Sequence, residues 1–301
     1  MRVGVFTDGL AHVSLSAALQ WLSEELPQMR DLEIGTGGYS PAAHCDVEAL
    51  AHDSGEARAW LDDIEASGFG LAALNVNGNP LEDPSHDRAL RSTIRLAAAI
   101  GVDVVACMSG GRPELSGGAW FAGLEDAVDE YWRERVVPYW RELAEIAATS
   151  RPSLRLCLEL EPGSAAFNMS TVERLLAIAP NLAVNVDPSH FFWQTIDPLA
   201  AVNRLGDRIG FAHGKDTILD AERIALDGVL DRTAWRYASV GQGHPLDWWA
   251  TFLETLHSTG YDGVISIEHE DESVSGEAGI VESARVLVEA SHSAGIGEVR
   301  A

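Results

Sequence analysis

The apolar residues of this chain form two kinds of segment that alternate from one end to the other. Short apolar runs are typical of buried β-strands, and longer stretches with helical periodicity are typical of amphipathic helices. The expected strands are Arg2–Asp8, Asp31–Gly35, Leu71–Asn77, Val102–Met108, Leu154–Glu161, Ala183–Asp187, Ile209–His213 and Val264–Glu268. The expected helices are Ser14–Leu26, Asp46–Ser67, Asp87–Ile100, Asp126–Thr149, Thr171–Ala179, Asp197–Leu205, Leu246–Ser258 and Gly276–Ala294. This alternation, without a flexible linker, predicts one (β/α)8 TIM barrel spanning residues 1–301.

A doubly wound open sheet has the same alternation and is the main competing fold. Nucleotide-binding sheets of that kind carry a glycine-rich GxGxxG turn after the first strand. Here the corresponding residues are Thr7-Asp8-Gly9-Leu10, which do not fit that turn. The barrel is therefore the better prediction.

Long connections follow several of the expected strands. They are Ser109–Glu125, Gly163–Ser170 and Gly214–Trp235. In a barrel each of them leaves the carboxyl-terminal rim, where substrates bind and active-site loops form. We expect the functional site at this rim.

The charge of the chain narrows the classes of partner. It has 46 acidic and 21 basic residues, which gives a formal net charge of −25. Nucleic acids and anionic membranes bind basic surfaces, so neither is an expected partner. No apolar run is long enough to span a bilayer, and the amino terminus does not fit a secretory signal. Because Cys45, Cys107 and Cys157 form no paired framework, we expect free thiols and a cytoplasmic protein.

Acidic residues and a histidine stand at the ends of successive expected strands in the second half of the chain. They are Glu159, Asp187, His213 and Glu268. One carboxylate after a strand is usually solvated or caps a helix, but acids gathered on one rim repel one another unless a cation holds them. Three carboxylates and one imidazole suit Mn²⁺, with Mg²⁺ and Co²⁺ as alternatives. The pattern therefore predicts a divalent metal site.

These strand ends also carry a resemblance. The runs Leu-Glu-Leu-Glu-Pro-Gly, Asn-Val-Asp-Pro-Ser-His, His-Gly-Lys-Asp and Ile-Glu-His-Glu-Asp resemble the sugar phosphate isomerase/epimerase superfamily, the xylose isomerase-like TIM barrels. The resemblance implies that Glu159, Asp187, His213 and Glu268 bind the metal, and that His190 contacts a substrate oxygen. It further implies that Glu159 and Glu268 transfer protons on opposite faces of a sugar carbon.

The chain departs from the epimerases of that superfamily at two places. Leu219 lies near the position of their substrate-binding arginine, and Lys215 is the nearest cation. Lys215 either contacts a carbonyl oxygen of the substrate as a catalytic group or pairs with Asp216 or Glu161. Glu161 itself replaces a histidine of many relatives, and it either supports the metal site and substrate or is a plain rim residue.

Other residues near the rim are candidates for substrate binding. Asn75 ends a strand, and amides there bind sugar hydroxyls, although the following residues also form a good turn. His44 follows another strand and either reaches the pocket or is solvated. Trp193, together with Ala119-Trp120-Phe121, either forms an aromatic wall for a sugar or planar aglycone or anchors its loop by packing.

The expected function is metal-assisted proton abstraction next to the carbonyl of a keto-sugar or inosose, through an enediolate. The alternative is the catalytic subunit of a C-glycoside deglycosidase, a lyase that expels the substituent of a 3-keto-glycoside by β-elimination. An apurinic endonuclease of the same superfamily is disfavoured, because Asp227-Gly228-Val229 stands where a further metal-binding histidine would be expected. The expected partners are a small carbohydrate and either further copies of the chain or a small accessory subunit.

Overall fold

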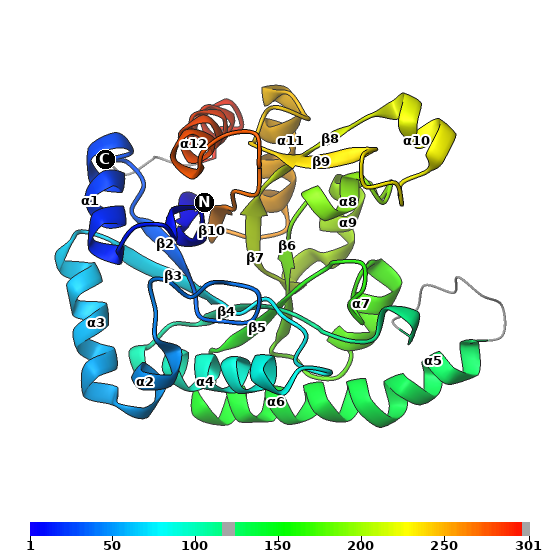
Figure 1. Cartoon of the computed structure of the whole chain (residues 1–301), viewed down its shortest axis with the longest axis horizontal. Helices are drawn as coiled ribbons and strands as arrows, with labels where there is room; N and C mark the ends of the chain where they lie inside the picture. Colours follow the sequence, from blue (N-terminus) through cyan, green and yellow to red (C-terminus); the bar gives the residue numbers. More distant parts are fainter. Residues whose placement is uncertain (116–123, 297–301) are drawn as a thin grey trace.

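A computed structural model describes residues 1–115 and 124–296 of the chain. Its central feature is a closed parallel barrel with the strand order β1-β10-β7-β6-β5-β4-β3-β2 (Figure 1). The barrel strands are β1 (Arg2–Phe6), β2 (Asp31–Gly35), β3 (Gly70–Asn75), β4 (Val104–Met108), β5 (Arg155–Glu159), β6 (Leu182–Val186), β7 (Ile209–Gly214) and β10 (Val264–Ile267). The predicted TIM barrel is confirmed.

Helices surround this barrel on its outer face (Figure 1). These helices are α1 (Leu15–Glu25), α2 (Val47–His52), α3 (Ser54–Ala66), α4 (Pro84–Ile100), α5 (Glu125–Tyr131), α6 (Val137–Ser150), α7 (Met169–Leu176), α9 (Pro198–Leu205), α11 (Leu246–Ser258) and α12 (Gly276–Ser293). The single-turn α8 (Ser189–Phe192) lies instead at the carboxyl-terminal rim, directly after β6. Among the described residues, no helix is both long enough and apolar enough to cross a bilayer.

The side chains inside the barrel change from apolar to polar along its axis. Nearer the amino-terminal ends of the strands lies a small apolar cluster of Ala73, Ala106, Cys157, Ala183, Phe211 and Val264. Side chains alternate between the two faces of a strand, so the residue two positions further also points inward. In β3, β5, β6 and β7 those next residues are Asn75, Glu159, Asn185 and His213, all buried. The strand periodicity therefore places a polar layer directly above the apolar one.

One predicted helix is broken into two in the structure, so that prediction was wrong in detail, and another is continuous but contains a π-helical turn. Asp46–Ser67 consists of α2 and α3, because the extended Asp53 ends the first and its carboxylate caps the second at the amides of Gly55 and Glu56. Asp126–Thr149 contains a π-helical turn at Trp132–Val136 between α5 and α6. Pro138, near the start of α6, has no amide hydrogen with which to continue the regular pattern.

The connection Gly214–Trp235, expected as a loop, carries a hairpin that projects beyond the barrel (Figure 1). Its strands β8 (Asp216–Leu219) and β9 (Trp235–Ala238) pair antiparallel, and α10 (Ala221–Asp227) lies at its tip. The strands are too short to be recognised from their own residues. The loop Ser109–Glu125 was also expected here, but its residues 116–123 lie outside the described residues.

Asp216 anchors the base of this hairpin. Its buried carboxylate accepts hydrogen bonds from the backbone amides of Thr217, Gly241, Gly243 and His244, at 2.8 to 3.1 Å. The His244 ring adds a contact of 2.7 Å. The side chain of Asp216 thus binds backbone amides of two segments, one at the start of β8 and one after β9, and holds these segments together.

Replacing Asp216 with Ala should lower the free energy of unfolding by about 3 kcal/mol or more, because four backbone amides, one buried and three partly buried, lose their acceptor. Asp220→Ala is the matched control, since Asp220 is an exposed cap of α10 and its loss should cost about 1 kcal/mol. Urea unfolding of both variants measures the difference. Equal losses in the two variants would show that the carboxylate of Asp216 is not the anchor.

Candidate metal centre

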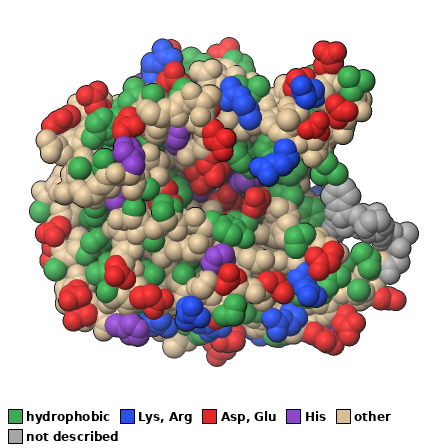
Figure 2. Space-filling view, viewed as in Figure 1, with side chains coloured by type: hydrophobic (Ala, Val, Ile, Leu, Met, Phe, Trp, Pro, Cys, Tyr) green, Lys and Arg blue, Asp and Glu red, His purple; other side chains and the backbone are tan. Residues whose placement is uncertain are grey.

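Four side chains gather where β5, β6, β7 and β10 end. Glu159, Asp187, His213 and Glu268 each offer one ligand atom, and these atoms all lie within 4.8 Å of one another. Glu159, Asp187 and His213 are buried, and Glu268 is half-buried. Figure 2 shows acidic and histidine side chains around a hollow on this face of the molecule. The residues that the sequence predicted as a metal site therefore do lie together.

His213 is oriented by a carboxylate on its far side. Its Nε2 lies 3.1 Å from both oxygens of Glu33, which is fully buried on β2. Its Nδ1 faces the cluster, 3.1 Å from Glu268 and 3.5 Å from Glu159. Burial opposes a charge on the ring, but Glu33 and Glu268 outweigh it and raise the pKa of His213. Glu33 thus favours a proton on Nε2 and leaves the Nδ1 lone pair for a cation.

Glu159 is held as a carboxylate by several donors. His190 Nε2 lies 2.9 Å from its Oε1, and the amide nitrogens of Asn77 and Asn185 donate to its Oε2 at 2.8 and 3.0 Å. Burial alone would raise its pKa, but the hydrogen bond from His190 and the nearby cationic groups lower it to about 2. Glu268 differs, because burial dominates and raises its pKa to about 7. The two glutamates therefore hold protons very differently.

Lys215 is the one lysine in the sequence, and it is buried beside this cluster. Its Nζ lies 2.6 Å from Glu268, 3.1 Å from Asp187 and 2.8 Å from Glu270. The ring of Tyr237 covers it, with the ring centre 4.6 Å from Nζ. Neither Asp216 nor Glu161, the partners considered from the sequence, pairs with it. Lys215 instead offsets the charge of two of the clustered carboxylates.

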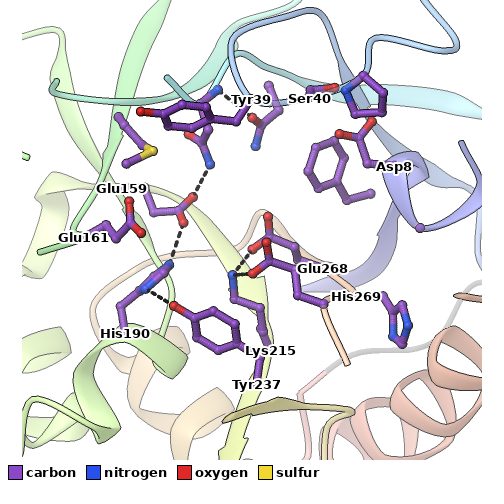
Figure 3. Close-up of a pocket in the computed structure, with 17 residues that line it drawn as sticks. Asp8, Tyr39, Ser40, Glu159, Glu161, His190, Lys215, Tyr237, Glu268 and His269 are labelled. Atoms are coloured by element: carbon purple, nitrogen blue, oxygen red, sulfur yellow. Dashed lines mark hydrogen bonds and ion pairs between the residues drawn. The ribbon is translucent and has the colours of Figure 1, made fainter. Parts of the chain in front are cut away.

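Tyr237, on β9, links the hairpin to the cluster. Its hydroxyl lies 3.0 Å from Nδ1 of His190, the ring nitrogen that does not face Glu159 (Figure 3). His190 is thereby held at both ring nitrogens. Burial and Lys215 lower the pKa of His190, but Asp187 and Glu159 outweigh them and raise it to about 9. The position of the His190 ring therefore depends on a residue from the projecting hairpin.

The donor set fits a divalent cation. The buried Oδ2 of Asp187 faces the cluster, where it lies 3.1 Å from Nζ of Lys215 and 3.7 Å from Nδ1 of His213 but accepts no well-aligned hydrogen bond from the described residues. Even with His190 and His213 charged beside Lys215, three cationic side chains do not neutralise four carboxylates, those of Glu33, Glu159, Asp187 and Glu268. Hard oxygen donors with one imidazole are the ligands of divalent ions that keep open positions for a substrate. These residues could therefore hold such an ion.

Glu159 and Glu268 of the cluster line a cavity of about 330 Å³, together with His190 and Lys215, and we call it the metal-site cavity. Asp8 and Tyr39 line its far side, and Glu161 lies beside Glu159 (Figure 3). Burial raises the pKa of Asp8 to about 6 and also raises the pKa of Glu161. The walls thus offer carboxyl and hydroxyl groups to a small polar molecule.

Comparison with known proteins places the chain in a family. The model of the xylose isomerase-like TIM barrel family matches residues 35–290. The chain belongs to this family.

A sequence relative and several solved structures are similar to this chain. Uncharacterized protein YfiH of Bacillus subtilis (strain 168) is 32% identical over 95% of this chain and 98% of its own length. The structure of L-ribulose 3-epimerase has a TM-score of 0.64 at 17% identity, over 98% of this chain and 97% of that one. The structure named the probable 3-DHS dehydratase AsbF of Bacillus anthracis has a TM-score of 0.68 at 17% identity, over 96% of this chain and 99% of that one. At such identities these structures show a shared fold.

The other residues predicted for the site differ in whether they line the metal-site cavity. Asn75 lines the metal-site cavity, but its amide nitrogen donates to Glu33 at 2.7 Å. His44 is not brought to the cavity, because its ring is buried against the backbone carbonyl of Val13 at 3.0 Å. Trp193 lies beside a second, more apolar cavity. The predicted aromatic partner Ala119-Trp120-Phe121 lies outside the described residues.

Several residues of the site were not predicted from the sequence. Glu33 stands between Leu32 and Ile34, and an acid inside a buried strand is a signal that could have revealed it. Asn185 is likewise a polar residue in the apolar strand β6. Tyr237 carries no such signal, because its place in the site depends on the pairing of β8 with β9.

Glu33→Gln should weaken the binding of Mn²⁺ by about 10- to 100-fold, because a neutral amide orients His213 less strongly than a carboxylate. Glu161→Gln should leave the affinity nearly unchanged, since Glu161 lines the same cavity without contacting His213. Isothermal titration calorimetry with Mn²⁺ measures both. An unchanged affinity in Glu33→Gln would contradict the orienting role of Glu33.

Proposed function

We propose that the protein is a divalent-metal-dependent sugar isomerase or epimerase. In this proposal it moves a proton at the carbon next to the carbonyl of a keto-sugar or inosose. The observation that carries the proposal is the placement of Glu159 and Glu268. Strands β6 and β7 separate β5 from β10 in the barrel, so the two carboxyl groups approach one cavity from different sides.

Glu159, Asp187, His213 and Glu268 would hold the ion, with Mn²⁺ favoured and Mg²⁺ or Co²⁺ as alternatives. When bound, a divalent ion supplies a Lewis acid that polarises a carbonyl and stabilises negative charge on its oxygen. The family and its structural neighbours, which include an epimerase, support chemistry of this kind.

The protein's own groups would move the proton. One glutamate removes the proton next to the substrate carbonyl, leaving an enediolate, and a carboxyl group on the other side returns a proton. Glu159 and Glu268 also have different partners, since Glu159 accepts hydrogen bonds from Asn77 and Asn185 whereas Glu268 pairs with Lys215, and this supports different roles for the two carboxyl groups. His190 and Lys215 are positioned to hold the substrate oxygens, and Glu161 lies at the same wall.

A screen in D₂O with added Mn²⁺ tests this proposal. Free ketoses, inososes and 3-keto-glycosides are incubated with the protein and followed by mass spectrometry. Deuterium at the carbon next to the carbonyl, with the carbon skeleton retained, would support the isomerase or epimerase. Release of a glycoside substituent would favour the second candidate, the lyase subunit of a C-glycoside deglycosidase acting by β-elimination. No exchange in any class would contradict the proposed chemistry.

Glu268→Gln and Glu159→Gln should each reduce turnover to below about a hundredth of the wild-type rate, because an amide does not transfer the proton. Glu270→Gln is the control, since Glu270 also pairs with Lys215 but is not among the clustered ligands. Deuterium incorporation gives the rate, and metal analysis shows whether the ion is retained. A variant that keeps about a tenth of the rate would rule out its residue as a proton-transfer group.

Tyr237→Phe should lower kcat by about tenfold, because His190 loses the hydrogen bond that fixes its ring. The affinity for Mn²⁺ should stay as in the wild type, since Tyr237 contacts none of the four clustered ligands. Tyr139→Phe is the control, because Tyr139 donates a hydrogen bond to Asp87 away from the site. Equal rates in Tyr237→Phe and the wild type would exclude this positioning role.

A further inference from the structure

A second cavity of about 800 Å³ lies between the projecting hairpin and the loops that follow β5 and β6. We call it the apolar cavity. Its apolar lining residues are Pro113, Pro162, Phe167, Trp193, Val229 and Leu230. Among the described residues that line it, Asp227 alone is charged. It therefore differs in character from the acidic metal-site cavity.

The two cavities are lined by neighbouring residues of the same chain segments. Glu161 lines the metal-site cavity, and the next residues, Pro162 and Gly163, line the apolar cavity. His190 and Trp193 are related in the same way, one on each cavity. The segments that follow β5 and β6 therefore lie between the two cavities, which are neighbours at the same rim of the barrel.

Aromatic rings join the same two regions. Trp193 stacks on Trp235 with ring centres 4.6 Å apart and an angle of 3° between the planes. Trp235 in turn meets Tyr237, whose ring lines the metal-site cavity, at 5.3 Å. Of these three rings, Trp193 lines the apolar cavity, and its flat indole is a typical surface for binding another planar ring.

The apolar cavity also leaves groups without partners. Leu230 is 61% exposed at its edge, an arrangement that is unfavourable for a large apolar side chain. The indole nitrogen of Trp193 is buried and has no hydrogen-bond partner among the described residues. A ligand with a flat apolar body and an oxygen at its edge would cover the first and accept a hydrogen bond from the second.

We propose that the apolar cavity binds a planar, uncharged aromatic substituent carried by the carbohydrate substrate. The inference rests on the proposed function, because the sugar end is assigned to the metal-site cavity. The volume suits a fused aromatic ring system. An anionic substituent is disfavoured by Asp227 in this cavity and Glu161 on the shared wall.

Binding of two inert glucosides tests the proposal without any turnover. The probes are 4-methylumbelliferyl β-D-glucopyranoside and methyl β-D-glucopyranoside, titrated by calorimetry into the Mn²⁺-loaded protein. The aryl glucoside should bind at least about tenfold more tightly, because its ring is removed from water against Trp193. Equal affinities, or no binding of either probe, would overturn the proposal.

A matched pair of leucine variants locates the effect. Leu230→Gln should lower the preference for the aryl glucoside by about threefold or more, since a polar edge replaces an apolar one. Leu226→Gln should leave it unchanged, because Leu226 is on the same hairpin and 76% exposed but does not line the cavity. An equal loss in both variants would overturn the assignment. Both are exposed positions, so folding is not at risk.

A third probe tests whether the two cavities act together. Free 4-methylumbelliferone should bind more weakly than its glucoside, because it lacks the sugar that occupies the metal-site cavity. Equal binding of the two would show that the apolar cavity is independent of the sugar, which overturns the proposal. These readouts are separate from deuterium exchange, so an inactive protein with a clear aryl preference would refute the proposed reaction and leave the apolar cavity established.

Discussion

The mutual repulsion of buried carboxylates is the constraint on which the rest of this site depends. Glu159, Asp187 and Glu268 converge inside a barrel, and Glu33 adds a further acid behind His213. Burial raises the cost of each negative charge, so the arrangement persists only where cations and hydrogen-bond donors surround it. Lys215, His190, His213 and the amides of Asn77 and Asn185 supply part of that compensation.

The projecting hairpin contacts the clustered carboxylates through residues that directly follow β7. Lys215 points to the carboxylates, and Asp216, next in the chain, holds the backbone that returns from β9. β9 then brings Tyr237 over the lysine and against His190. The hairpin, which lies outside the barrel, is thus part of the framework of the site, and its Trp235 extends the same framework to the apolar cavity.

The barrel and the clustered ligands could be predicted from the sequence because both depend on local patterns. Apolar alternation marks the strands, and the parallel barrel necessarily brings their carboxyl ends together at Glu159, Asp187, His213 and Glu268. Residues that depend on tertiary pairing were missed. Tyr237 reaches the site only through β8 and β9. His44 follows a strand as the four clustered residues do, but its ring lies against the carbonyl of Val13 instead. The break of helix Asp46–Ser67 depends on the extended backbone of Asp53 and on its carboxylate, which caps α3.

The presence of a single lysine gives this chain an unusual spectroscopic property. Apart from the amino terminus, Lys215 carries the sole primary amine of the protein. The amino terminus pairs with Asp262, just before β10, at the opposite end of the barrel strands. Isotopically labelled lysine would therefore produce one side-chain ammonium signal in a nuclear magnetic resonance spectrum. That signal originates within 3.1 Å of Asp187 and Glu268. The chain thus contains an intrinsic reporter whose chemical shift would change if a divalent ion were held by the neighbouring carboxylates.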